Sequence, residues 1–176
     1  MAHITPCVAG SFCILINSMN AITKDELQQR LADAHISLRI RKSIRFVPSE
    51  IAHWSERDFS AVMDKARHDG VLLNDDFTVP FSLSARLPNT SGRIEAVICD
   101  ICATWRRGTE SAVITFKKGK NATVSHLVCA DLDCSLHVRS MTNAAAISRT
   151  QLREDIDSEQ RVRRLRTRLK NIVSNL

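Results

Sequence analysis

Apolar residues recur at three- and four-residue intervals near the start of the chain, and this spacing predicts a helix. Thr23 stands three residues before Glu26, the arrangement of a capping box that begins a helix. The apolar positions that follow are Leu27, Leu31, Ala34 and Leu38. Since they share one face of a helix, we expect an amphipathic helix from Thr23 to about Arg41.

A second helix is predicted over residues 55–70. Ser55 has the side chain of an N-cap, Glu56 and Asp58 suit the first turn, and Gly70 is typical of a C-terminal stop. The apolar positions between them are Phe59, Val62, Met63 and Ala66. Their spacing is again helical, so we expect residues 23–90 to form a small helical N-terminal domain.

The chain changes character after residue 71, and a domain boundary is predicted near residue 90. Pro80, Pro88 and the polar cluster 89–92 indicate a loop-rich connection. We therefore expect a second domain over residues 91–176.

Residues 1–22 are predicted to be an N-terminal extension. The first Lys or Arg is Lys24, so the apolar segment "CVAGSFCILI" has no basic region of the kind that begins a signal peptide, and we expect a cytoplasmic protein. Met19 precedes the predicted helix directly, which favours it as an alternative start and residues 1–18 as dispensable. Cys7 and Cys13 are then interpreted as small hydrophobic side chains.

The second half has the pattern of short strands and one long helix. "RIEAVICDIC" predicts a strand that ends in the pair Cys99 and Cys102, and the β-rich runs on either side of "KKGKN" predict a hairpin with Gly119 at its bend. A short helix is expected after Cys134. The C-terminal segment has an apolar stripe at helical spacing, which favours core packing. The stripe consists of Val162, Leu165, Leu169, Ile172, Val173 and Leu176. The fold class is therefore predicted as α+β.

Four cysteines of the second half have the spacing of a metal site. Cys99 and Cys102 form one close pair, Cys129 and Cys134 form another, and the hairpin brings the pairs together. Four thiolates around one tetrahedral zinc ion are the favoured interpretation, while a redox-active dithiol and inert or disulfide-bonded cysteines remain alternatives. His126 and His137 lie nearby and are interpreted as hydrogen-bonded neighbours rather than ligands.

The order of knuckle, hairpin and ligand pair at the start of a helix is that of a treble-clef zinc finger. A closed site of four thiolates has no open position for water or substrate, so it is structural. Zinc with four thiolates has a local charge of −2, which the nearby basic residues Arg106, Arg107 and Arg139 would offset.

The cysteine motifs resemble a known family. The second half is similar to the C-terminal treble-clef zinc finger of the elongation factor G-binding family, which is the FusB-type family of fusidic acid resistance. The similar segments are "CDIC" at 99–102, the hairpin, "CADLDCSLHVR" at 129–139 and the closing "RVRRLRTRLKNIV". The resemblance covers about 80 residues from Ile94 onwards. It implies four zinc-binding cysteines at the positions named above. It also implies that the zinc domain binds translation elongation factor G, as it does in resistance proteins that release this factor from the ribosome.

Charge indicates where a partner would bind. The chain has 25 Lys and Arg against 19 Asp and Glu; residues 1–90 contain ten of each, so the net charge of +6 belongs to residues 91–176. A basic half favours an acidic partner such as a ribosome, RNA or an acidic protein face. The candidate partner-binding residues are Lys117, Lys118 and Lys120 at the hairpin tip, together with Arg106, Arg107 and Arg139.

A small basic zinc module that binds ribosomal or other RNA directly is the alternative function. The C-terminal helix favours it through the dense basic residues Arg161, Arg163, Arg164, Arg166, Arg168 and Lys170. Against it, the chain has no tyrosine and two tryptophans, whereas single-stranded nucleic acid is bound largely on aromatic side chains.

Enzymes and membrane proteins are the least supported classes. The sequence has no phosphate loop, dinucleotide fingerprint or nucleophile elbow, and we predict no enzymatic activity. No apolar run approaches the roughly 18 residues that a membrane helix needs.

Overall fold

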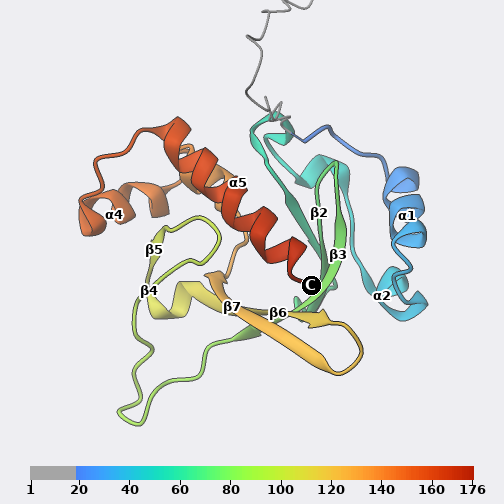
Figure 1. The fold of residues 1–176 in the computed structure, drawn as a ribbon, viewed down its shortest axis with the longest axis horizontal. Coiled ribbons are helices and arrows are strands. Elements are labelled where there is room, and N and C mark those ends of the chain that lie inside the picture. The colour runs from blue at the N-terminus through green and yellow to red at the C-terminus, as the bar shows by residue number, and fades with distance from the viewer. Residues whose placement is uncertain (1–18) are drawn as a thin grey trace, which may run out of the picture.

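The computed structural model describes residues 19–176, which form mixed helix and sheet (Figure 1). The predicted extension up to residue 18, with Cys7 and Cys13, lies outside the described residues. The helices are α1 Lys24–Asp33, α2 Leu38–Ser43, α3 Cys134–Val138, α4 Asn143–Leu152 and α5 Ser158–Ser174, with short 3-10 turns at Pro48–Glu50, Trp54–Glu56 and Gly108–Glu110. The strands are β1 Ser60–Met63, β2 Asp69–Leu73, β3 Thr78–Ala85, β4 Val97–Ile98, β5 Trp105–Arg106, β6 Ser111–Lys118 and β7 Ala122–Cys129.

The first predicted helix is shorter than expected. The capping box is confirmed: the Glu26 N–H donates to the Thr23 hydroxyl, and the Thr23 N–H donates to the Glu26 carboxylate, which lowers the pKa of Glu26. Helix α1 ends at Asp33, because His35 has a positive φ of 53° that breaks the helix. The chain then begins the separate helix α2, so the prediction of one continuous helix to Arg41 was wrong.

The predicted helix over residues 55–70 was wrong as well. This segment forms the 3-10 turn Trp54–Glu56, strand β1 and the start of β2, and Gly70 lies inside β2 opposite Met63. The apolar positions are buried, but on both faces of a strand: Phe59 and Met63 belong to one core cluster and Val62 to the other. A strand covered on both faces has no polar alternation, so its apolar spacing matched a helix by chance.

A single five-stranded antiparallel sheet joins the two halves of the chain, in the order β1-β2-β3-β6-β7. The predicted boundary near residue 90 falls in the loop between β3 and β4, but β3 and β6 on either side of it pair over five residues from Phe81↔Phe116 to Ala85↔Ala112. Residues 23–90 are therefore not purely helical. The division of the chain into two domains stays a prediction.

Two hydrophobic clusters cover the two faces of the sheet. Helix α1 packs over one face, where Leu27 and Leu31 are fully buried, and Met19 and Ile22 of the predicted extension join them. Helix α5 lies across the other face (Figure 1), and there its Leu165 is fully buried in the same cluster as the four cysteines. The predicted core stripe of α5 is thus confirmed, and the cysteines lie inside the main core.

Helix α4 was not predicted from the sequence. Its start had a readable signal, because the Thr142 hydroxyl accepts the Ala145 N–H as an N-cap. The long helix α5 begins in the same way, with a capping box between Asp157 and Gln160. None of the helices among residues 19–176 is long and apolar enough to cross a membrane.

Candidate metal centre

Two tight turns present the four cysteines. The first turn connects the short strands β4 and β5, which pair through Val97 and Ile98, and contains Cys99 and Cys102. It closes through the Cys99 N–H, which donates to the Thr104 carbonyl, and the Ala103 N–H, which donates to the Cys99 carbonyl. We call residues 97–106 the knuckle.

The second turn connects the hairpin to helix α3. Cys129 is the last residue of β7 and Cys134 is the first residue of α3, and Leu132 between them has a positive φ of 59°. The Leu132 N–H donates to the Cys129 carbonyl, and the Asp133 N–H donates to the Asp131 carboxylate. The predicted hairpin with Gly119 at its bend and the predicted helix after Cys134 are both confirmed.

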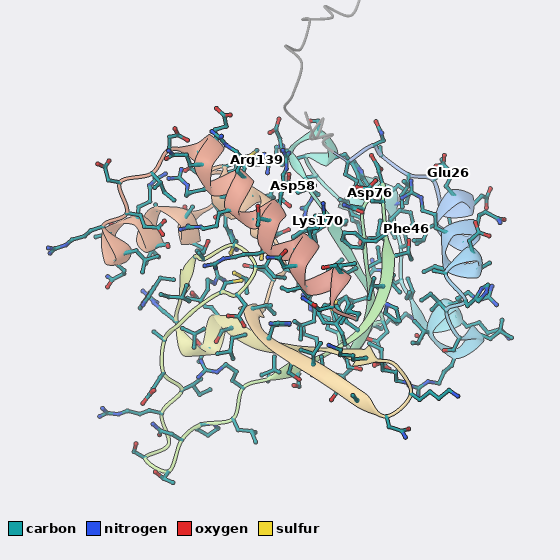
Figure 2. The ribbon with its side chains drawn as sticks, in the orientation of Figure 1. Glu26, Phe46, Asp58, Asp76, Arg139 and Lys170 are labelled. Atoms are coloured by element: carbon teal, nitrogen blue, oxygen red, sulfur yellow. The ribbon has the colours of Figure 1, made fainter. Side chains whose placement is uncertain are left out.

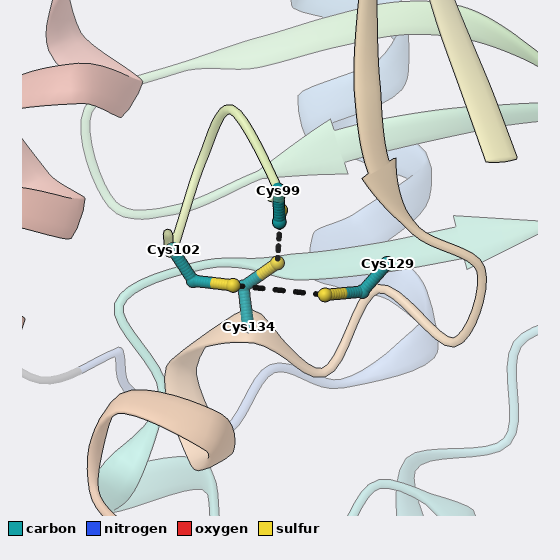
Figure 3. A group of neighbouring side chains, drawn as sticks. All are labelled: Cys99, Cys102, Cys129 and Cys134. Atoms are coloured by element: carbon teal, nitrogen blue, oxygen red, sulfur yellow. Dashed lines mark hydrogen bonds between the residues drawn. The ribbon is translucent and has the colours of Figure 1, made fainter. Parts of the chain in front are cut away.

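The four sulfur atoms form one compact buried group (Figure 3). Cys99 Sγ lies 3.8 Å from Cys134 Sγ, Cys102 Sγ lies 3.6 Å from Cys129 Sγ, and all four atoms lie within 4.8 Å of one another. Ligands placed 2.3 Å from a tetrahedral zinc ion are about 3.8 Å apart, so the observed separations suit zinc. All four side chains are fully buried or nearly so and exist as free cysteines. The cluster is consistent with one structural zinc ion.

The close packing of the four sulfur atoms shifts the pKa values of Cys99, Cys129 and Cys134. Burial acts to raise the pKa of Cys99, but hydrogen bonds from Cys102, Cys129 and Cys134 outweigh it and hold that pKa well below its ordinary value. Hydrogen bonding to Cys102 is the largest cause that raises the pKa of both Cys129 and Cys134 well above normal. A divalent cation at the centre would stabilise all four sulfur atoms as thiolates.

Polar groups around the cluster hold the knuckle in place. The Cys102 thiol donates to the Thr104 hydroxyl at 3.1 Å, and a hydroxyl can also donate to a thiolate. The Asp100 N–H donates to the Leu127 carbonyl, which ties the knuckle to β7. Arg168 of α5 donates to the carbonyls of Cys99 and Asp100 at 3.4 and 3.5 Å. The C-terminal helix therefore braces the knuckle, a role that no sequence pattern indicated.

His137 is a hydrogen-bonded neighbour of the cluster, as predicted. His137 is buried, with Nδ1 2.8 Å from the Thr142 hydroxyl and Nε2 3.1 Å from the Asp131 carboxylate. His126 Nδ1 lies 3.6 Å from the Asp100 carboxylate. A second set of side chains has ligand atoms close enough together to hold a metal ion, namely Cys129, Asp131 and His137. This group shares Cys129 with the four-sulfur cluster, and its histidine and aspartate are already bonded to each other.

The predicted partner-binding residues divide into two sets. Arg106 is buried, and it donates to Asp131 at 2.9 Å, while Arg139 binds the Asp58 carboxylate, so these two arginines act inside the molecule. The other four residues are exposed, and no ion pair to them occurs among the described residues: Arg107, Lys117, Lys118 and Lys120.

Asp58 is an anchor that sequence reasoning missed. Its side chain is 2% exposed and accepts hydrogen bonds from Arg139 and from Arg166 of α5, while its N–H donates to the Ser135 hydroxyl. Figure 2 shows Asp58 and Arg139 beside α5. The neighbouring Arg57 donates to Asp133 at 2.9 Å. The chain before β1 is thereby fixed to α3, the helix that begins with Cys134.

A known protein family matches the chain. The family model described as FBP C-terminal treble-clef zinc-finger matches residues 37–176, which is most of the chain and includes strands β1 to β3 as well as the knuckle and hairpin. Neither a curated protein nor a solved structure matches the chain.

Proposed function

Because the chain belongs to the FBP C-terminal treble-clef zinc-finger family, we propose that it is a non-enzymatic, zinc-binding adaptor that binds translation elongation factor G and modulates its action or release on the ribosome. The family match over residues 37–176 is the observation that carries this proposal. The motif "CADLDCSLHVR" at 129–139 supports the same partner through its resemblance to elongation factor G-binding proteins. The expected location is the cytoplasm, where this factor works.

The geometry of the cysteine cluster supports binding rather than catalysis. Cys99, Cys102, Cys129 and Cys134 would hold zinc with all four tetrahedral positions filled by sulfur. The ion would then supply folding free energy and fix the knuckle against the hairpin and α3. The tip of the hairpin, residues 117–121, lies beyond the pairing of β6 with β3, and its residues are exposed (Figure 1).

Direct binding of RNA through α5 is less well supported. Arg161, Arg164 and Arg168 donate to groups of the protein itself, namely the Val138 carbonyl, the Glu154 carboxylate and the knuckle carbonyls. Arg166 binds Asp58. Arg163 and Lys170 are the members of the predicted basic face that stay exposed, and Arg163 lies 3.4 Å from Glu159. A face with most of its charge used internally is a poor site for a phosphate backbone.

A direct binding experiment tests the proposal. Zinc-loaded protein is immobilised and incubated with lysate of the same organism, with and without nuclease, and the bound proteins are identified by mass spectrometry. We expect elongation factor G to be retained after nuclease. It should be lost with the Cys129→Ser/Cys134→Ser variant, in which the zinc fold cannot form. Recovery of ribosomal RNA alone, abolished by nuclease, would contradict the proposal and favour the RNA-binding alternative.

A further inference from the structure

Strand β7 is one edge of the five-stranded sheet, and the knuckle covers only part of its outer side. The Asp100 N–H donates to the Leu127 carbonyl at 2.7 Å, and the Leu127 N–H donates to the Asp100 carboxylate at 2.8 Å. Both backbone groups of Leu127 therefore point away from β6. Because this direction alternates along an antiparallel strand, the N–H and C=O groups of Ser125 and Thr123 also point outward.

The outer edge over residues 122–126 is open. Within residues 19–176, no backbone hydrogen bond reaches the outward groups of Thr123 or Ser125, and both residues are exposed. Strands β6 and β7 pair continuously from Ser111↔Cys129 to Lys118↔Ala122 without a bulge, and β7 contains neither proline nor lysine. Natural edge strands use such features to prevent pairing with another chain. Their absence leaves this edge able to accept an added strand.

The charge of the hairpin indicates which strand it would accept. Residues 111–129 contain three lysines and no aspartate or glutamate. The lysines Lys117, Lys118 and Lys120 are exposed at the tip, whereas Asp100 lies at the opposite end of the open edge. A strand with carboxylates near the tip would be attracted, because opposite charges across an interface guide association and set the register.

We propose that β7 binds an extended acidic segment of the protein partner as a sixth strand of the sheet, over residues 122–126. This inference rests on the proposed function, in which the partner is elongation factor G. Five residues of a strand span about 17 Å. The outward backbone groups of Thr123 and Ser125 supply the hydrogen bonds, and the three lysines select an acidic sequence.

A proline substitution tests the strand directly. Ser125→Pro removes one outward N–H but no backbone hydrogen bond to β6, and proline is tolerated on an edge strand in this orientation. It also removes the exposed side-chain hydrogen bond between Ser125 Oγ and Thr115 Oγ1 of β6, which are 2.8 Å apart. The matched control is Ala61→Pro on β1, the other edge strand. There the Arg45 N–H donates to the Met63 carbonyl, so the Ala61 N–H, two residues earlier, also points outward.

Binding of purified elongation factor G is then compared by calorimetry. We expect Ser125→Pro to raise Kd at least about tenfold, since the added strand loses a hydrogen bond and meets the proline ring, and Ala61→Pro to leave it within about twofold. Reversing Lys117, Lys118 and Lys120 to Glu should weaken binding and slow association. Reversing the exposed residues Lys65, Arg93 and Lys170 instead should have a smaller effect.

Amide hydrogen exchange on the unaltered protein provides a second readout that needs no variant. The Thr123 and Ser125 amides should exchange quickly in the free protein and slowly in the complex. If the factor binds but these amides stay unprotected and Ser125→Pro binds normally, the added strand is refuted while the proposed function stands. If the unaltered protein does not bind the factor, both fail. If lysine reversal and nuclease treatment both abolish binding but Ser125→Pro does not, RNA mediates the interaction, and the added strand is also overturned.

Discussion

Replacing Asp58 with asparagine should destabilise the whole zinc-bound protein. The Asp58 carboxylate is 2% exposed, and it accepts from two guanidinium groups that are themselves 14% (Arg139) and 23% (Arg166) exposed. Asparagine keeps the shape of the side chain but removes the charge and points N–H donors at these arginines. Breaking a buried ion pair from one side typically costs about 3 to 5 kcal/mol.

The structure places the expected cost at the lower end of that range. Arg139 would keep the Glu56 carboxylate at 3.4 Å and the Ser135 carbonyl at 3.0 Å, and Arg166 can reach water. We therefore expect a loss of about 3 kcal/mol in the free energy of unfolding. For a chain of this length that corresponds to a fall in Tm of about 6 to 12 °C.

The assay is thermal and urea unfolding at a fixed concentration of free zinc, with Glu56→Gln as the control. Glu56 contacts Arg139 from a half-exposed position, with 46% of its side chain exposed, so its loss should cost less than about 1 kcal/mol. Asp58→Asn should also release zinc faster to a chelator, because Asp58 positions helix α3 and its Cys134. If Asp58→Asn is no less stable than Glu56→Gln, the reasoning about this anchor is refuted.

Three further predictions concern zinc, pH and packing. Removing zinc with a chelator should unfold the sheet as well as the knuckle, since the four cysteines share one core cluster with Phe116 and Leu165. If the β6 and β7 amides stay protected from hydrogen exchange after chelation, this prediction is contradicted. The hydrogen bonds from Arg164 lower the pKa of Glu154 below 4.5. The ionised Glu154 therefore stabilises the fold above about pH 4.5, and this contribution disappears as the pH falls through the lowered pKa. The difference in urea midpoint between the unaltered protein and Glu154→Gln should therefore be largest near neutral pH and shrink below pH 4.5; a difference that does not vary with pH would count against it. Gly108→Ala should lower the free energy of unfolding by about 1 to 3 kcal/mol, because its Cβ would lie 2.0 Å from the Ile94 carbonyl oxygen. A Cβ at Gly119 meets no atom within 4 Å, so the control Gly119→Ala should show only the smaller cost of its positive φ. Equal losses in Tm would refute the packing argument.

The candidate metal centre was predictable because its signals are local. Cys99 and Cys102 stand in one turn, Cys129 and Cys134 flank another, and a hairpin with a recognisable bend at Gly119 connects them. Each of these features depends on a few neighbouring residues, as do the caps at Thr23 and Asp157. The role of Asp58 was not predictable in this way. Its partners Arg139 and Arg166 are 81 and 108 residues away along the chain.

By itself, the sequence determined the capping box at Thr23, the hairpin, the helix after Cys134 and the grouping of four cysteines into one candidate zinc site. The tertiary structure alone decided that residues 60–85 form strands and that β3 pairs with β6 across the predicted boundary. The apolar residues of β1 and β2 face two different cores, and only the packing of α1 on one face and α5 on the other distinguishes such strands from a helix. The same packing uses Arg161, Arg164, Arg166 and Arg168 internally and leaves Lys117, Lys118 and Lys120 exposed. Which charges stay free for a partner depends on contacts between segments far apart in the chain, and a linear pattern does not record them.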